Sequence, residues 1–301
     1  METTKGQWLE LIIESHPSLT DSITYFLISL LKRGVHIEED FNKDDCSERI
    51  LAYLSQDDLK KSSLKKIKDY FSRLHDLNPD LSRIKTHEKI IQDKDWSENW
   101  KKYFKPFNIG SFFIKPTWEK SFHAPKGFII EINPGQAFGT GAHASTSLVM
   151  EAMEKIFKEM EFEKPSVIDV GTGTGILAMA AQKLGASRVL AIDVDEKALK
   201  TAKENIALND LEGAILLSNQ PLSFITEKFD LVLANIERAT LIELSGDLME
   251  KMKTDGCLII SGIIQGQEKD VLNAFSGLKK VFSLHKEDGG LLWTCMVLRH
   301  E

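Results

Sequence analysis

The sequence predicts an α/β protein whose larger, C-terminal domain is organised around one strand–turn–helix–strand unit. Residues 167–195 run from an apolar strand through a glycine-rich turn into an Ala- and Leu-rich helix and a second apolar strand. Two strands joined across Asp288-Gly289-Gly290 end the chain, which predicts a terminal antiparallel hairpin. Residues 1–92 show a strand–helix–strand pattern twice, which predicts a smaller α+β domain in front.

The first domain, residues 1–92, is expected to contain four strands and two helices. Thr20 or Asp21 is a candidate cap for the first helix, and Gly34 is a candidate stop. Lysines between residues 60 and 68 are expected on the solvated side of the second helix rather than in a binding face. This element order is typical of a ferredoxin-like fold. The strands are expected at 8–14, 35–38, 49–54 and 83–91, and the helices at 20–32 and 57–74.

Residues 93–108 are expected to form a linker helix that is crowded with aromatic side chains. Its aromatic residues alternate with lysines, a mixture that also occurs on nucleic-acid and partner surfaces. A helix that buries these aromatics against both domains is the favoured interpretation. The aromatic residues are Trp96, Trp100, Tyr103, Phe104 and Phe107.

The second domain, residues 109–301, is expected to hold a mostly parallel sheet between helices. Ser145, Thr146 and Ser147 are expected to cap or open its first helix. Its strands are expected at 109–116, 128–132, 167–170, 189–194, 214–217, 229–236, 256–263, 281–285 and 291–298. Its helices are expected at 148–157, 176–184, 196–208 and 268–275, with a further helix that ends near residue 252.

The glycine-rich turn predicts a nucleotide-like cofactor. Gly171, Gly173 and Gly175 allow a tight turn and a close approach of a ligand to the backbone, and the following helix offers free N–H groups to a carboxylate. Asp193 ends the second strand, where an acid can accept hydrogen bonds from ribose hydroxyls. The spacing is G-x-G-x-G with Asp169 two residues ahead, whereas a dinucleotide fingerprint is G-x-G-x-x-G.

Two further segments carry candidate functional residues. Residues 133–147 form a Gly-rich loop that is placed to close over a ligand. Within it, His143 is a candidate general base, and a histidine that only hydrogen-bonds the loop is equally compatible. Asn235 ends an apolar strand at the carboxyl edge of the sheet, where open α/β sheets bind their ligands.

Bulk properties favour a cytoplasmic protein. A net charge of −7 argues against broad nucleic-acid binding, so no direct nucleic-acid partner is expected. Cys46, Cys257 and Cys295 lie far apart without a metal-ligand spacing, which favours reduced thiols and no metal site. No signal peptide or membrane-length apolar run is visible, and we expect a monomer without a membrane partner.

The chain resembles the bacterial ribosomal protein L11 methyltransferase family, PrmA. The motifs that carry the resemblance are DWSENWKKYFKPF, IKPTWE, NPGQAFGTGAHASTS, VIDVGTGTGILAMAA and LVLANI. The resemblance implies a Rossmann-like, seven-stranded methyltransferase domain that uses S-adenosylmethionine, with an N-terminal domain that recognises the substrate. It also implies methylation of lysine side chains and the N-terminal amine of ribosomal protein L11. By the same resemblance, Thr146, Gly171, Asp193 and Asn235 match cofactor-binding positions.

Two short segments depart from the family pattern. Asn235-Ile236 is followed by Glu237-Arg238-Ala239-Thr240, where the family usually continues with Leu-Ala and a proline soon after. Ala144-Ser145 stands where the family commonly has Pro-Thr. We hypothesise that Asn235 aligns the acceptor amine and that Glu237 holds the incoming ammonium and accepts its proton. An exposed Glu237 paired with Arg238 at a helix start is an equally good interpretation.

Three other functions stay open at this point. The first is a methyltransferase for another protein lysine, an RNA base or a small-molecule amine. The second is a nicotinamide-dependent oxidoreductase, against which the G-x-G-x-G spacing and the terminal hairpin argue. A third is a binding module without catalytic activity, because residues 237–240, at the rim where the acceptor amine should bind, differ from the family pattern.

Overall fold

The computed structural model describes the chain in segments that divide between two compact units, Met1–Phe104 and Lys105–Glu301. The predicted linker helix lies mostly outside these segments, and its last residues are not helical, because Phe107 begins a strand. Most of the predicted Gly-rich loop also lies outside them. The described residues are 7–16, 19–31, 35–38, 48–77, 84–92, 105–119, 127–133, 141, 143–159, 164–288 and 290–300.

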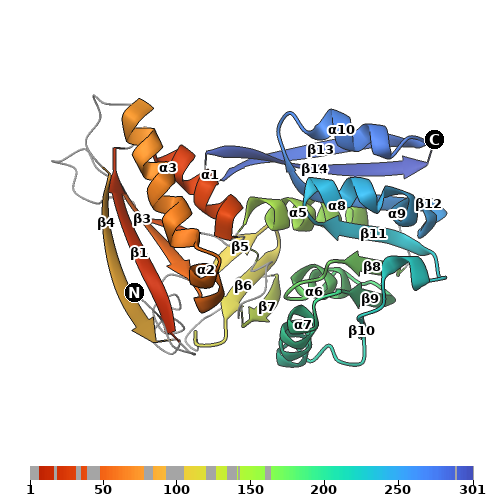
Figure 1. Ribbon diagram of the computed structural model, residues 1–301. Coiled ribbons are helices and arrows are strands. Elements are labelled where there is room, and N and C mark those ends of the chain that lie inside the picture. The colour runs from red at the N-terminus through yellow and green to blue at the C-terminus, as the bar shows by residue number, and fades with distance from the viewer. Residues whose placement is uncertain are drawn as a thin grey trace. The chain divides into compact units, whose positions relative to one another are not determined.

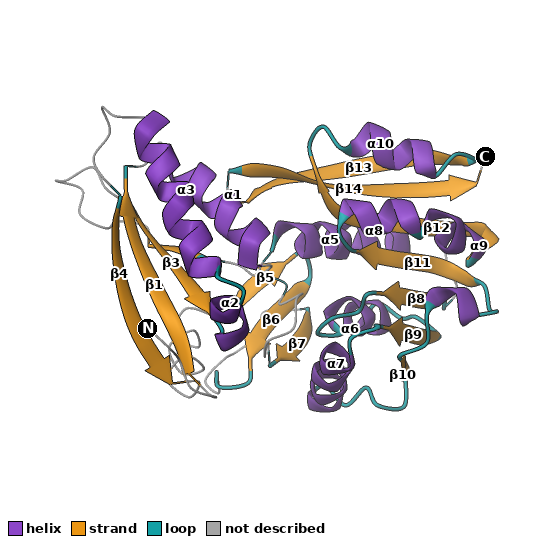
Figure 2. Ribbon diagram, in the orientation of Figure 1, coloured by secondary structure: helices purple, strands orange, loops and turns teal. Residues whose placement is uncertain are grey.

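The N-terminal unit is an antiparallel four-stranded sheet with helices α1 and α3 packed against one face (Figures 1 and 2). The strand order is β2-β3-β1-β4. Alternate residues of β1, namely Leu9, Leu11 and Ile13, are fully buried in the core that these helices complete. The elements are β1 (Gln7–Ser15), α1 (Thr20–Leu31), β2 (His36–Glu38), β3 (Glu48–Leu54), α2 (Gln56–Lys60), α3 (Ser63–Leu77) and β4 (Lys85–Gln92).

The predicted helix over residues 57–74 is wrong in one respect, because it is two helices. Ser62 between α2 and α3 has a φ of 58°, a left-handed conformation that an α-helix cannot contain. Ser55 and Asp58 form a reciprocal capping box at the start of α2. Leu59 and Leu64 on either side of the break are five residues apart, an interval longer than helical spacing that the sequence prediction passed over.

A small three-stranded sheet, in the order β5-β6-β7, opens the second unit. Its strands are β5 (Phe107–Ile109), β6 (Phe112–Pro116) and β7 (Phe128–Ile132). The single strand predicted over 109–116 is therefore wrong, because the chain turns at Gly110 and Ser111. Gly110 has a φ of 53°, and the Glu154 carboxylate accepts the Ser111 backbone N–H at 2.6 Å.

The second unit is built on a mixed seven-stranded sheet with the order β10-β9-β8-β11-β12-β14-β13 (Figure 1). The first five strands in this order pair in parallel, whereas β14 pairs antiparallel with both β12 and β13. The strands are β8 (Ser166–Val170), β9 (Arg188–Ile192), β10 (Ile215–Ser218), β11 (Phe229–Asn235), β12 (Met252–Ile264), β13 (Leu278–Asp288) and β14 (Leu291–His300). The terminal hairpin that the sequence predicts is confirmed.

Helices cover this sheet, and most of them match the predicted ranges closely. They are α5 (Ala144–Glu159), α6 (Ile176–Lys183), α7 (Glu196–Leu208), the 3-10 turn η2 (Leu222–Phe224), α8 (Arg238–Glu243), α9 (Ser245–Glu250) and α10 (Glu268–Ala274). The helix predicted to end near residue 252 is divided at Leu244 into α8 and α9. Strand β13 extends beyond its predicted range, because its polar, exposed residues at the sheet edge give no apolar signal.

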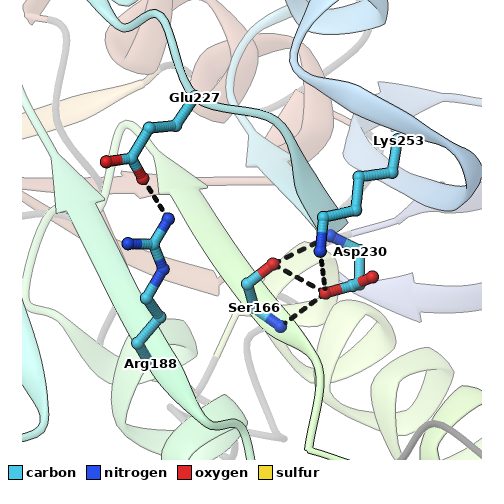
Figure 3. A network of polar contacts seen from close by, with 5 residues as sticks. All are labelled: Ser166, Arg188, Glu227, Asp230 and Lys253. Atoms are coloured by element: carbon cyan, nitrogen blue, oxygen red, sulfur yellow. Dashed lines mark hydrogen bonds and ion pairs between the residues drawn. The ribbon is translucent and has the colours of Figure 1, made fainter.

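Polar contacts join the amino-terminal ends of β8, β11 and β12, three neighbouring strands of this sheet (Figure 3). The Asp230 carboxylate accepts from the Ser166 hydroxyl at 2.6 Å and from Lys253 Nζ at 2.9 Å. Burial raises the pKa of Asp230, but these hydrogen bonds outweigh it and hold the pKa below its usual value. Arg188 of β9 pairs with Glu227 beside them. These contacts therefore connect the starts of neighbouring strands at one edge of the sheet.

Candidate active site

The glycine turn lies between β8 and α6 at the carboxyl-terminal edge of the sheet. Gly171, Gly173 and Gly175 have φ values of 74°, 56° and 82°, all in the left-handed region that favours glycine. The N–H groups of Gly171 and Thr172 both donate to the carbonyl of Ile192 in the neighbouring strand β9. The predicted tight turn is therefore present, and it is anchored to the next strand.

Asp193 follows β9 directly and contacts the glycine turn. Its Oδ2 accepts the N–H of Gly173 at 2.9 Å, and its Oδ1 accepts the N–H of Asp195 at 3.0 Å. Asp195 in turn caps α7. Next to Asp193, the Val194 side chain is 80% exposed.

Asp169, at the end of β8, is a buried acid without full hydrogen bonding. Its Oδ2 accepts from the Thr172 hydroxyl at 2.6 Å, whereas its buried Oδ1 has no partner among the described residues. Burial raises the pKa of Asp169 to about 7 against the opposing effects of hydrogen bonds from the Thr172 hydroxyl and the Ala178 backbone N–H. An unpartnered buried carboxylate oxygen beside a glycine turn is typical of a ligand site.

Asn235 and Thr146 are brought together although they lie far apart in the sequence. Asn235 ends β11, and its Nδ2 donates to the hydroxyl of Thr146, in the first turn of α5, at 3.1 Å. Thr146 is fully buried. The Oδ1 of Asn235 is also buried and has no partner among the described residues, so it is an available acceptor.

His143 precedes α5 and binds its first turn. Its carbonyl accepts the N–H groups of Thr146 and Ser147, and its Nδ1 lies 3.2 Å from the backbone N of Ser145, whose N–H it accepts. Burial lowers the pKa of His143, while Asp288 opposes this shift. Because Nδ1 is engaged as an acceptor, the geometry favours the loop-bonding interpretation over a general base.

Ile236, which follows Asn235, packs against two glycines. A Cβ on Gly171 would lie 2.6 Å from Ile236 Cγ2, and a Cβ on Gly262 would lie 2.2 Å from the Ile236 carbonyl oxygen. The segments that follow β8 and β11 therefore meet β12 at Ile236. Gly262, inside the apolar run of β12, was not singled out in the sequence, although an isolated strand glycine signals close backbone approach.

Glu237 stands at the start of α8 with an exposed side chain that does not cap the helix. Arg238 pairs with Asp270 of α10 at 3.0 Å. The expected exposure of Glu237 at a helix start is confirmed, whereas its expected pairing with Arg238 is not, because Arg238 pairs with Asp270.

Comparisons with known proteins agree on one family. The family model described as ribosomal protein L11 methyltransferase (PrmA) matches residues 7–301. The chain belongs to this family. Proteins named ribosomal protein L11 methyltransferase from Pelobacter propionicus and Geotalea daltonii are 35% identical over 303 residues and 38% identical over 312 residues. Each alignment covers 97% of both chains.

A solved structure supports the same assignment. A ribosomal protein L11 methylase from Lactobacillus delbrueckii subsp. bulgaricus is 33% identical, with a TM-score of 0.58, and covers 66% of this chain and all of its own. The chain therefore has an α/β methyltransferase fold with a mixed sheet and helices. It is an S-adenosylmethionine-dependent methyltransferase, and the oxidoreductase alternative is not favoured.

Membrane-spanning helices and metal-binding clusters are both absent from the described parts of the chain. No helix there is long and apolar enough to cross a membrane. Nor does that part of the chain gather three or more metal-binding side chains.

Proposed function

We propose that this chain transfers methyl groups from S-adenosylmethionine to lysine and N-terminal amines of ribosomal protein L11. The relatives of this chain are named ribosomal protein L11 methyltransferase, which supports L11 as the substrate. The observation that supports amine chemistry is the Asn235–Thr146 pair, which leaves a buried, unpartnered carbonyl oxygen at the carboxyl edge of the sheet. An amine N–H is a suitable donor for that oxygen.

The cofactor-binding residues are proposed to be Gly171, Gly173, Asp193, Thr146 and Asn235. The positive φ values of the glycines and the unpartnered Oδ1 of Asp169 fit a ligand held against the backbone. Asp193 is placed to accept from ribose hydroxyls, and the exposed Val194 offers an apolar surface to a planar base. When bound, S-adenosylmethionine supplies a methyl group that its sulfonium already activates.

The protein's task is then to position a neutral amine in line with that methyl group. A lysine amine has a reference pKa of about 10.4 and must lose a proton before it attacks. Thr146 fixes the Asn235 side chain through Nδ2, which directs Oδ1 away from Thr146. We propose that Oδ1 accepts one amine N–H, so that the amine lone pair faces the methyl group.

Glu237 is proposed to hold the incoming ammonium and to accept its proton. Its side chain is exposed at the rim, directly after Asn235-Ile236. Glu237→Leu is expected to lower kcat/KM for the amine substrate by about three- to tenfold, because a rim charge steers and orients a cation. Steady-state kinetics measure this effect. Glu243→Leu, which changes an exposed glutamate at the end of the same helix, is the control. An unchanged kcat/KM in Glu237→Leu would contradict the role.

Asp169 makes stability depend on pH. Its pKa is about 7 in the folded chain and about 3.9 when unfolded, so the folded chain keeps a proton that the unfolded chain loses. Stability is therefore expected to fall as pH rises from about 4 to about 7. Without cofactor, the free energy of unfolding of Asp169→Asn is expected to be about 2–4 kcal/mol higher than that of the parent protein at pH 8. Near pH 4 the two free energies of unfolding are expected to be equal. Urea unfolding at both pH values measures this, and a pH-independent difference would contradict it.

A cation bound beside Asp169 would favour its ionised form. The affinity of the parent protein for S-adenosylhomocysteine, which carries an ammonium group, is therefore expected to rise several-fold between pH 6 and pH 8. Titration calorimetry measures this change. In Asp169→Asn the rise should be absent, and an equal rise in both proteins would assign the titration to another group.

The finer features of the architecture are proposals as well. We infer that the antiparallel order β2-β3-β1-β4 makes the N-terminal unit ferredoxin-like, and that residues 1–92 recognise the ribosomal protein. Residues 93–108 are proposed to link it to a Rossmann-like catalytic domain, 109–301. Because the proposed substrate is a ribosomal protein, we propose a cytoplasmic monomer that needs no direct nucleic-acid contact.

Labelled methyl transfer to purified L11 tests the amine assignment. Label is expected on untreated L11 and not on L11 whose lysines and N-terminus have been acetylated. Equal labelling of both proteins would move the acceptor away from amines and favour another target group.

A further inference from the structure

The terminal hairpin contacts the first turn of α5 through three pairs of residues. The Asp288 Oδ2 accepts the Ala144 N–H at 2.8 Å. Lys286 Nζ donates to the Ser147 hydroxyl at 3.0 Å. The rings of Trp293 and His143 meet edge to face, with centroids 4.4 Å apart. Because β13 and β14 supply all three, the end of the chain holds the start of a helix that lies about half a chain earlier.

Asp288 completes the capping of α5. The first N–H groups of a helix have no partner inside it. The His143 Nδ1 accepts the N–H of Ser145, and the His143 carbonyl accepts those of Thr146 and Ser147. The N–H of Ala144 donates to Asp288 Oδ2. A carboxylate at this end also interacts favourably with the helix dipole. The cap therefore combines a local histidine with a distant aspartate.

The capped turn carries Thr146, two residues after Ala144. Thr146 orients the Asn235 amide through the 3.1 Å hydrogen bond. A shift of this turn would move the Thr146 hydroxyl and release the amide to rotate. Two hydrogen bonds, Ala144 to Asp288 and Asn235 to Thr146, together with the helix turn between Ala144 and Thr146, thus connect the hairpin to the proposed amine-binding oxygen.

We propose that Asp288 is a positioning residue for methyl transfer, which acts by fixing the first turn of α5 and, through Thr146, the orientation of Asn235. This inference rests on the proposed function in one respect, the alignment of the amine by Asn235. Asp288 itself touches neither substrate nor cofactor in this role.

Three single variants test the proposal. Asp288→Leu removes the acceptor and is expected to lower kcat about tenfold, because misalignment acts on turnover. KM for S-adenosylmethionine is expected to rise less, by no more than about threefold, because Thr146 and Asn235 are only part of the proposed cofactor site and the glycine turn and Asp193 are unaltered. Asp288→Asn keeps an oxygen that accepts the Ala144 N–H and should restore kcat to within about threefold of the parent. Glu287→Ala changes an exposed neighbour and is the control. Thermal unfolding of all three variants checks that each of them is still folded under the assay conditions.

A double variant separates positioning from general damage. If Asp288 acts through Asn235, Asp288→Leu should cost no further turnover in an Asn235→Ala background. A full additional tenfold loss there would overturn the proposal, as would equal losses in Asp288→Leu and Asp288→Asn.

Hydrogen exchange gives a readout that does not depend on the substrate. In the protein without substrate, Asp288→Leu is expected to speed amide exchange in residues 143–147 about five- to tenfold, as loss of a helix cap predicts. Unchanged exchange would overturn the cap itself. If the parent protein fails to methylate L11 while exchange rises as expected, the substrate proposal fails and the structural link stands.

Discussion

Asn235→Ala is expected to lower kcat for methylation of L11 by about 100-fold or more. The substitution removes the oxygen proposed to accept the amine N–H, and misplaced reacting groups lose catalysis of this order. Cofactor affinity is expected to fall less than tenfold, because the glycine turn and Asp193 are unaltered. Single-turnover kinetics with saturating cofactor measure the chemical step, and calorimetry measures binding.

The control for Asn235→Ala is Asn273→Ala, which changes an exposed asparagine on α10. Asn273→Ala should leave both kcat for methylation of L11 and cofactor affinity unaltered. Full turnover together with full cofactor affinity in Asn235→Ala would rule out the alignment role. A loss confined to cofactor affinity would reassign Asn235 as a binding residue only.

Gly171→Ala is the second substitution with a large expected effect. Its Cβ would lie 2.6 Å from Ile236 Cγ2, and its φ of 74° is strained for alanine. We expect about 2–4 kcal/mol lower stability from strain and overpacking together. The same shift should weaken cofactor binding at least about tenfold, because Asn235 precedes Ile236 and the turn itself lines the proposed site. Urea unfolding and calorimetry measure the two effects.

Gly185→Ala is a matched control, because Gly185 also has a positive φ, 107°, but a Cβ added there would meet no atom within 4 Å beyond its chain neighbours. Backbone strain should lower its free energy of unfolding by about 1–2 kcal/mol, and its affinity for the cofactor should not change. Equal losses of stability and of cofactor affinity in the two variants would mean that the contact with Ile236 does not determine the geometry of the cofactor site.

Most of the catalytic unit could be predicted from the sequence, because its signals are local. Buried parallel strands such as β8 and β11 are short apolar runs, and the glycines between β8 and α6 mark a turn. Breaks within amphipathic segments were missed at Ser62 and Leu244. Apolar residues keep helical spacing across Leu244, whereas the five-residue interval between Leu59 and Leu64 is an irregularity that the prediction passed over. The exposed edge strand β13 was shortened because its residues are mainly polar.

Contacts between distant segments account for what the sequence did not reveal at the site. Asp193, Asn235 and Thr146 were named, but the hydrogen bond between the last two depends on how α5 packs near β11. Nothing near residue 288 indicates that Asp288 bonds Ala144. Similarly, the buried state of the Asp169 Oδ1 results from packing around β8, which the motif alone does not specify.

Mass spectrometry of unmethylated L11 from the same organism, after incubation with this protein and S-adenosylmethionine, tests the central claim most directly. The account predicts mass gains in steps of one methyl group, which peptide mapping places on lysine side chains and the N-terminal amine. No gain, with cofactor binding confirmed separately on the same preparation, would contradict L11 as the substrate.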